Sequence, residues 1–179
     1  MKKAIYLMVA TLLVVGFDNE SSAQSAQTVQ KSPKSVLTQT VGLTDITITY
    51  HRPGLKGREM GSMAKEGKVW RTGANNATAF LISNAITIGG KELAAGNYSL
   101  WTIPAEGEWT IIINSKHGWG TSYDESGDVM RFKAKATKTA ETTETVTINI
   151  SDIDANGKDA ALEIRWGNVS VKAPFTVSK

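Results

Sequence analysis

The sequence predicts an all-β protein, a single β-sandwich of jelly-roll type with about ten strands. From Ser35 onward, short runs of alternating apolar and polar residues recur, as in strands that are buried on one face. Glycine, asparagine and aspartate, which favour turns, separate these runs. Residues 60–67 are the one stretch with a helical pattern, so we expect one short helical turn there.

The expected strands follow one another at short intervals, and most are rich in β-branched or aromatic residues. In LAAGNY (93–98), the spacing is that of a tyrosine corner, so the Tyr98 hydroxyl should bond to the backbone just upstream. The glycine pair at 89–90 predicts a two-residue hairpin. The strands are expected at 36–41, 45–50, 78–83, 85–93 (two short strands around the glycine pair), 96–103, 108–114, 129–136, 144–150, 160–166 and 169–177.

The first 23 residues have the pattern of a secretory signal peptide. Two lysines precede an apolar run over 4–17, and small residues at 21–23 offer a cleavage site. We therefore expect cleavage near Ala23-Gln24 and an exported protein, periplasmic or extracellular, with no membrane span after cleavage. The polar residues 24–34 are predicted to form a flexible leader, and residues 35–179 the β-sandwich domain.

The composition narrows the classes of function. The chain has no cysteine, which excludes disulfides, thiolate metal sites and a lipid anchor on cysteine. Its formal net charge of +3 is too low for a typical nucleic-acid binder, so no nucleic-acid partner is expected. His51, His117, Asp124 and Glu59 share no zinc-site spacing, so neither a metal nor a cofactor is expected.

Two successive glycine-rich loops, 50–61 and 67–76, carry the residues that we consider first as a ligand site. Arginine side chains bind carboxylate, phosphate or sulfate through paired hydrogen bonds, and asparagine amides beside an aromatic ring suit sugar hydroxyls. We therefore expect a small anion or a glycan as the partner. The candidates are Arg52, Arg58, Trp70, Arg71, Asn75 and Asn76.

A third loop, 114–128, is long and polar for a hairpin connection, and long loops in compact domains are often functional. His117, Trp119 and Tyr123 give it aromatic faces for stacking, so they join the candidate ligand-binding residues. We expect the loop either to close over the arginine-rich loops as a lid or to cap one end of the sandwich.

Three functions remain open from the residues alone. The first is a non-catalytic binding or envelope-associated module that uses these loops. The second is a hydrolase in which His51 or His117 acts with Asp124, although no G-x-S-x-G motif is present. The third is a structural or partner-binding domain whose arginines satisfy loop carbonyls, with Arg71 paired to Asp45 or Glu163 and Trp70 in the core.

Several blocks of the sequence resemble a family of exported bacterial proteins catalogued as a domain of unknown function. The blocks are YHRPGLKGREMG (50–61), KVWRTGANNAT (68–78), AGNYSLWTIP (95–104), EWTIIIN (108–114) and GWGTSYD (118–124). The resemblance spans about 32–177, and its most specific block is WRTGAN (70–75), after which this chain has Asn76 where the family has an acidic residue. The resemblance implies one exported β-domain and no particular activity.

Overall fold

The computed structural model describes residues 28–178, so the expected signal peptide over 1–23 lies outside the described part of the chain. The described residues form nine strands, β1 to β9, and two 3-10 turns, η1 (Met60–Ser62) and η2 (Glu125–Gly127). The all-β class and the helical turn within 60–67 are confirmed, and η2 is an addition. The strands are β1 (Lys34–Val41), β2 (Thr44–His51), β3 (Thr78–Ile82), β4 (Ile86–Ile88), β5 (Lys91–Leu93), β6 (Gly96–Ile103), β7 (Glu108–Asn114), β8 (Asp128–Ser151) and β9 (Asp159–Val177).

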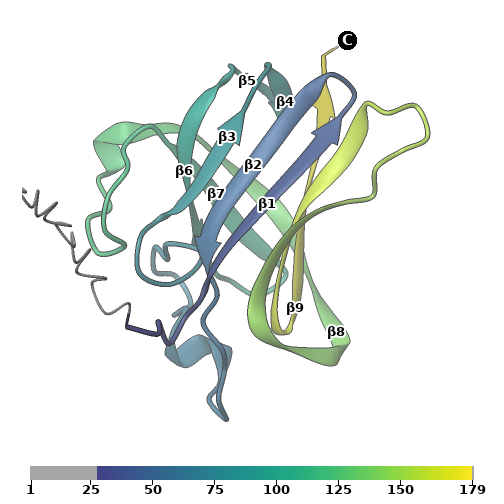
Figure 1. Ribbon diagram of the computed structural model, residues 1–179. Helices are drawn as coiled ribbons and strands as arrows, with labels where there is room; N and C mark the ends of the chain where they lie inside the picture. Colours follow the sequence, from purple (N-terminus) through teal and green to yellow (C-terminus); the bar gives the residue numbers. More distant parts are fainter. Residues whose placement is uncertain (1–27, 179) are drawn as a thin grey trace, which may run out of the picture.

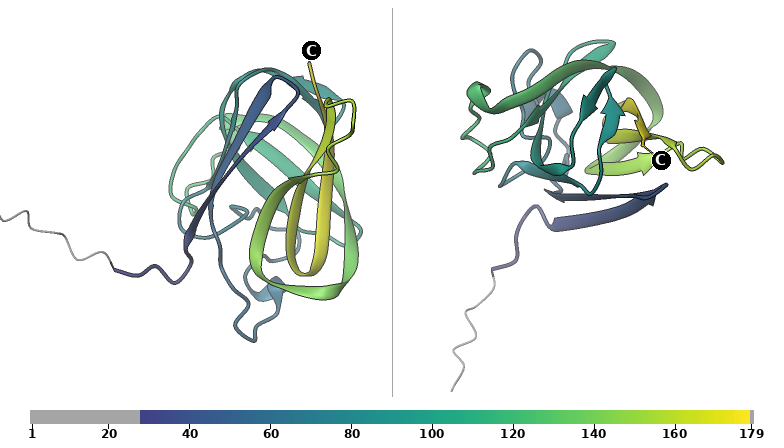
Figure 2. Two further views of the ribbon diagram at one scale, coloured as in Figure 1. Left: turned by 45° about the vertical axis from the view of Figure 1, so that its right-hand side comes forward. Right: turned by 90° about the horizontal axis from the view of Figure 1, so that it is seen from above.

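All nine strands belong to one antiparallel sheet, in the order β1-β2-β3-β6-β7-β8-β9-β4-β5. The β4–β5 hairpin turns at Gly89 and Gly90, as predicted, and the other edge of β4 pairs with the end of β9 rather than with β3. Seen from above, the sheet curls around a common interior, with β1 and β2 on one side (Figure 2). These pairings establish an antiparallel β-fold, and they do not by themselves establish the jelly-roll order.

The two longest strands, β8 and β9, each turn back on themselves, β9 inside β8 (Figure 1). β9 bends at Gly167, whose φ is +57°. The Asn168 side chain accepts a hydrogen bond from Thr142 Oγ1 at 3.0 Å and donates one to the Thr139 carbonyl at 3.4 Å, which holds the outer bend around the inner one. Four of the strands expected from the sequence are therefore halves of two bent strands: 129–136 and 144–150 belong to β8, and 160–166 and 169–177 belong to β9. At the bend of β8, the mostly polar residues 137–143 turn the chain without leaving the sheet.

The sheet closes on itself at one end, where the chain beyond β2 meets the second arm of β8. Val146 N–H donates to the Pro53 carbonyl at 3.0 Å, and Leu55 N–H donates to the Glu144 carbonyl at 2.9 Å. Slightly further along, the Tyr50 hydroxyl accepts from Ile148 N–H at 3.0 Å, so a side chain spans the gap where the strands diverge. We call residues 50–55 and 144–148 the seam.

The interior between the curled faces is apolar, and its burial from water is the main stabilising contribution. Trp70 stacks on Trp166 with ring centroids 5.3 Å apart, and it meets Trp109 edge-on at 6.2 Å. The Tyr98 hydroxyl donates to the Ala94 carbonyl at 2.9 Å, which confirms the predicted tyrosine-corner bond. Fully buried residues from the strands include Ile46, Ile48, Phe80, Leu100, Ile111, Ile113 and Ile164. Within residues 28–178, no helix is long and apolar enough to cross a membrane.

Candidate functional site

The loop between η1 and β3 is fixed tightly against the sheet. Trp70 and Thr102 exchange two backbone hydrogen bonds, of 2.7 and 2.8 Å, and Ala74 N–H donates to the His51 carbonyl at 3.2 Å. Thr72 and Asn75 have φ values of +55° and +57°, which side-chain-bearing residues adopt only where surrounding contacts enforce them. Contacts within the protein therefore fix the conformation of the loop that carries the asparagines.

The 114–128 loop packs against the loop between η1 and β3. Asn76 and Trp119 form an isolated antiparallel bridge, and Gly120 N–H donates to the Asn75 carbonyl at 2.9 Å. Gly120 has no room for a side chain, because a Cβ there would collide with Arg71 and with the Asn75 carbonyl. The two loops are thus joined through their backbones.

This junction leaves one tryptophan ring at the surface. Of the five tryptophans, all within the described residues, four are at most 7% exposed, whereas Trp119 is 57% exposed. Trp119 borders an open cavity of about 330 Å³. We call its lining the Trp119 site, which consists of Gln30, Lys31, Ser32, His51, Asn75, Asn76 and Trp119.

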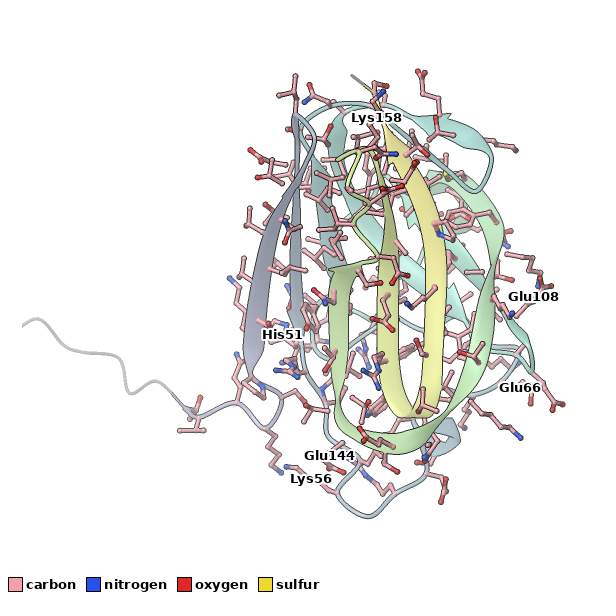
Figure 3. All side chains as sticks on the ribbon, turned by 90° about the vertical axis from the view of Figure 1, so that its right-hand side faces the viewer. His51, Lys56, Glu66, Glu108, Glu144 and Lys158 are labelled. Atoms are coloured by element: carbon pink, nitrogen blue, oxygen red, sulfur yellow. The ribbon has the colours of Figure 1, made fainter. Side chains whose placement is uncertain are left out.

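The Trp119 site has mixed hydrogen-bonding character. Asn75 Nδ2 donates to Gln30 Oε1 at 3.3 Å, so one amide already bridges to the N-terminal segment, while the Asn76 side chain is exposed. Burial, and then the charge of Lys34, lowers the pKa of His51, which favours the neutral imidazole at neutral pH. Figure 3 labels His51 on the side from which the N-terminal segment departs. Amide and imidazole groups beside an indole can donate to and accept from a hydroxylated ligand.

Two of the candidate arginines, Arg52 and Arg58, lie outside the lining of the Trp119 site. Arg52 lies in the seam, where Nε donates to the Val146 carbonyl at 2.8 Å and Nη2 donates to Thr145 and Thr147 Oγ1 at 3.1 and 2.9 Å. Arg58 donates to the carbonyls of its own loop, from Nε to Leu55 at 2.9 Å and from Nη2 to Gly54 at 3.0 Å. Both side chains therefore hold the chain together at the closed end.

Arg71 and Trp70 also lie outside the lining of the Trp119 site. Arg71 lies half-buried behind Gly120, and its Nη1 donates to the Asn75 carbonyl at 3.3 Å. It forms no ion pair with Asp45 or Glu163, which instead accept hydrogen bonds from Thr40 and Ser170. Trp70 is 7% exposed and belongs to the core cluster described above, so its ring is not a surface platform.

His117 and Tyr123 anchor the 114–128 loop. His117 Nε2 donates to the Asn97 carbonyl at 3.1 Å. The Tyr123 ring packs on Trp101 with centroids 5.0 Å apart, and burial together with the hydrogen bond to Asp128 raises its pKa to about 12. Both side chains thus bind the loop to the sheet.

The histidine–carboxylate pair of the hydrolase hypothesis is not assembled. Asp124 is held by Lys116 Nζ at 2.5 Å and by the Ser126 backbone at 2.9 Å. These contacts lower the pKa of Asp124 to about 2, with the Lys116 hydrogen bond as the largest cause. No cluster of three or more metal-ligating side chains occurs in the part of the chain that the structure describes.

Sequence reasoning missed part of the Trp119 site. Gln30, Lys31 and Ser32 come from the segment expected to be a leader, and no motif there indicates a site. Only the folded arrangement shows that this segment runs past the end of β2 and beside the 70–76 loop.

The chain was also compared with known proteins. No curated protein and no solved structure matches it. A family model described as a protein of unknown function (DUF2911) matches residues 32–175, which is nearly all of the described structure, and this confirms the family resemblance inferred from the sequence blocks. The chain therefore belongs to the DUF2911 family of proteins of unknown function.

Proposed function

We propose that this protein is an exported, non-catalytic binding module that holds a glycan at the Trp119 site. The observation that carries the proposal is the exposed indole of Trp119, fixed by backbone bonds beside Asn75 and Asn76. An aromatic ring offers an apolar face to the C–H side of a sugar ring, and neighbouring amides suit its hydroxyls. Export is proposed from the pattern of residues 1–23.

The geometry favours a glycan over a small anion. Arg52 and Arg58 donate to groups within the fold, and Arg71 lies behind Gly120, so the guanidinium cluster expected from the sequence is dispersed. Lys31 is the one cation among the residues that line the cavity. Anion sites in proteins usually combine several charge-assisted donors, whereas this surface offers mainly neutral groups.

The rigid platform also favours binding without a large entropic cost. Thr72 and Asn75 already occupy left-handed conformations, and the 114–128 loop is bonded to the 70–77 loop. A preorganised site loses less conformational freedom on binding than a flexible loop does. The Trp119 ring should therefore contact a sugar without rearrangement of the backbone.

The test is titration of the purified protein with short oligosaccharides of glucose, N-acetylglucosamine and xylose, followed by tryptophan fluorescence and calorimetry. We expect at least one to bind, and we expect Trp119→Ala to weaken it by about tenfold or more, the usual cost of losing a central aromatic contact. Leu81→Ala is the matched control, because Leu81 is also an exposed apolar side chain, 45% exposed, but lies on β3 outside the site. Binding of none of these sugars, or equal losses in both variants, would contradict the proposal.

A further inference from the structure

A second hollow lies at the closed end of the sheet, away from the Trp119 site. It contains an apolar cavity of about 330 Å³, which lies in the size range of small-molecule sites. Three of the residues that line it are alanines, whose small side chains leave the space open, and the buried Trp109 indole lines it from the core. The apolar lining consists mainly of Ala64, Pro104, Ala105, Trp109, Ala136 and Val169.

A polar cavity of about 490 Å³ adjoins the apolar one. Met60, Gly61 and Val169 line both cavities, so the two spaces meet along one wall. Figure 3 labels Glu66 and Glu144, which line the apolar and the polar cavity respectively, and shows both at the end where β8 and β9 turn back. Both cavities are open to solvent, so one elongated ligand that crosses the shared residues can place an apolar part in the first cavity and a polar part in the second.

The polar cavity offers donors and acceptors together. Arg58 brings the Nη1 end of its guanidinium, since its Nε and Nη2 donate to the Leu55 and Gly54 carbonyls. Glu59 and Glu144 bring carboxylates, and Glu144 Oε1 also accepts from Lys56 N–H at 2.7 Å. Asn168 and Thr142 add an amide and a hydroxyl. One cation against two carboxylates disfavours an anionic head group, and hydroxyl groups, which both donate and accept, fit such a mixed set.

We propose that this double cavity binds an amphiphile with one apolar chain and an uncharged, hydroxylated head group. The chain packs against Trp109 and the three alanines, and the head group hydrogen-bonds with Arg58 Nη1 and Glu144 Oε2, the atoms that the loop contacts of these two side chains do not use. Met60 stands between the two parts, and its flexible thioether side chain can adjust to chains of different thickness.

The probe is 1-O-octylglycerol below its critical micelle concentration, titrated into the purified protein by calorimetry. We expect its affinity to exceed that of 1-O-hexylglycerol by about fourfold for each added methylene, because each methylene leaves water for the apolar cavity. Octanoate carries a chain of similar length with an anionic head group, and it should bind more weakly because two carboxylates face one guanidinium in the polar cavity. Tighter binding of octanoate, or of octylammonium, would overturn the assignment of an uncharged head group.

Two substitutions locate the bound chain. Ala105→Phe fills the apolar cavity from the turn after β6, and it should weaken 1-O-octylglycerol at least tenfold. Ala95→Phe is the matched control, because Ala95 is exposed in the turn before β6, at the opposite end of that strand. Ala136→Leu narrows the same cavity from β8 and serves if Ala105→Phe folds poorly.

The outcomes separate this site from the glycan site. Octylglycerol binding should persist in Trp119→Ala, because the ring of Trp119 lines a different cavity. Absence of octylglycerol binding overturns the proposal. Binding that both Ala105→Phe and Ala136→Leu leave unchanged also overturns it, because the chain would then lie elsewhere.

Discussion

The seam makes Arg52 the most informative single position for stability. Its guanidinium donates three hydrogen bonds to residues 93 to 95 positions away in the sequence, and these bonds join the chain beyond β2 to the second arm of β8. Arg52→Met removes all three donors while keeping an unbranched apolar stem. Arg58→Met is the matched control, because Arg58 bonds only to carbonyls three and four residues away.

The expected loss follows from the number and setting of these bonds. Buried bonds to a charged group contribute about 1.5–3 kcal/mol each. Arg52 is half-buried and water can replace part of what is lost, so we count about 1 kcal/mol for each bond, or about 3 kcal/mol in total. For a domain of this size that corresponds to a fall in Tm of about 6–12 °C. Arg58→Met should cost about 1 kcal/mol or less, because its side chain is exposed.

The assay is urea unfolding of the purified protein and both variants, followed by tryptophan fluorescence. The buried cluster of Trp70, Trp109 and Trp166 should report the loss of the core. A change below about 1 kcal/mol in Arg52→Met, or losses of equal size in the two variants, would refute the role assigned to the seam.

Three further outcomes are expected. Tyr50→Phe leaves the Ile148 N–H without the acceptor that spans the seam, so it should lower the free energy of unfolding by about 1–3 kcal/mol, measured by urea unfolding. Gly120→Ala collides with neighbouring groups, so it should displace the 114–128 loop and abolish sugar binding while leaving octylglycerol binding intact. The carboxylate of Asp124 should titrate near pH 2 by NMR, and Lys116→Met should move that midpoint upward. Because the folded pKa lies below the ordinary value of 3.8, any stability from this contact is present above pH 3.8 and lost as pH falls through about 2.

The strands could be predicted from the sequence because each strand has a local residue pattern of its own. Alternation of apolar and polar residues marks a strand that is buried on one face, and the glycine pair at 89–90 specifies its hairpin locally. No comparable local sequence pattern indicates the bends of β8 and β9. Residues 137–143 are mostly polar, as in many turns, and only the folded pairing of β8 with β9, together with the bonds of Asn168, shows that they stay within the sheet.

The site was less predictable, for a related physical reason. Arginine and asparagine in a glycine-rich loop bind a ligand or satisfy loop carbonyls with the same donors, so residue type alone does not decide between the two. Arg52 found its partners on β8, more than ninety positions away in sequence, which no local pattern encodes. Trp119 remained exposed because backbone bonds, rather than its side chain, hold the 114–128 loop in place.

The seam lies between the two proposed sites and connects them. His51, immediately before Arg52, lines the Trp119 site, whereas Leu55, three positions after it, lines the polar cavity. A substitution that loosens the seam without unfolding the protein should therefore weaken both ligands. Arg58→Met should weaken only the amphiphile, because Arg58 lines the polar cavity alone. If Arg52→Met weakens both ligands while Arg58→Met weakens only the amphiphile, the seam supports both proposed sites. If Arg52→Met leaves either ligand unaffected, that site does not depend on the seam.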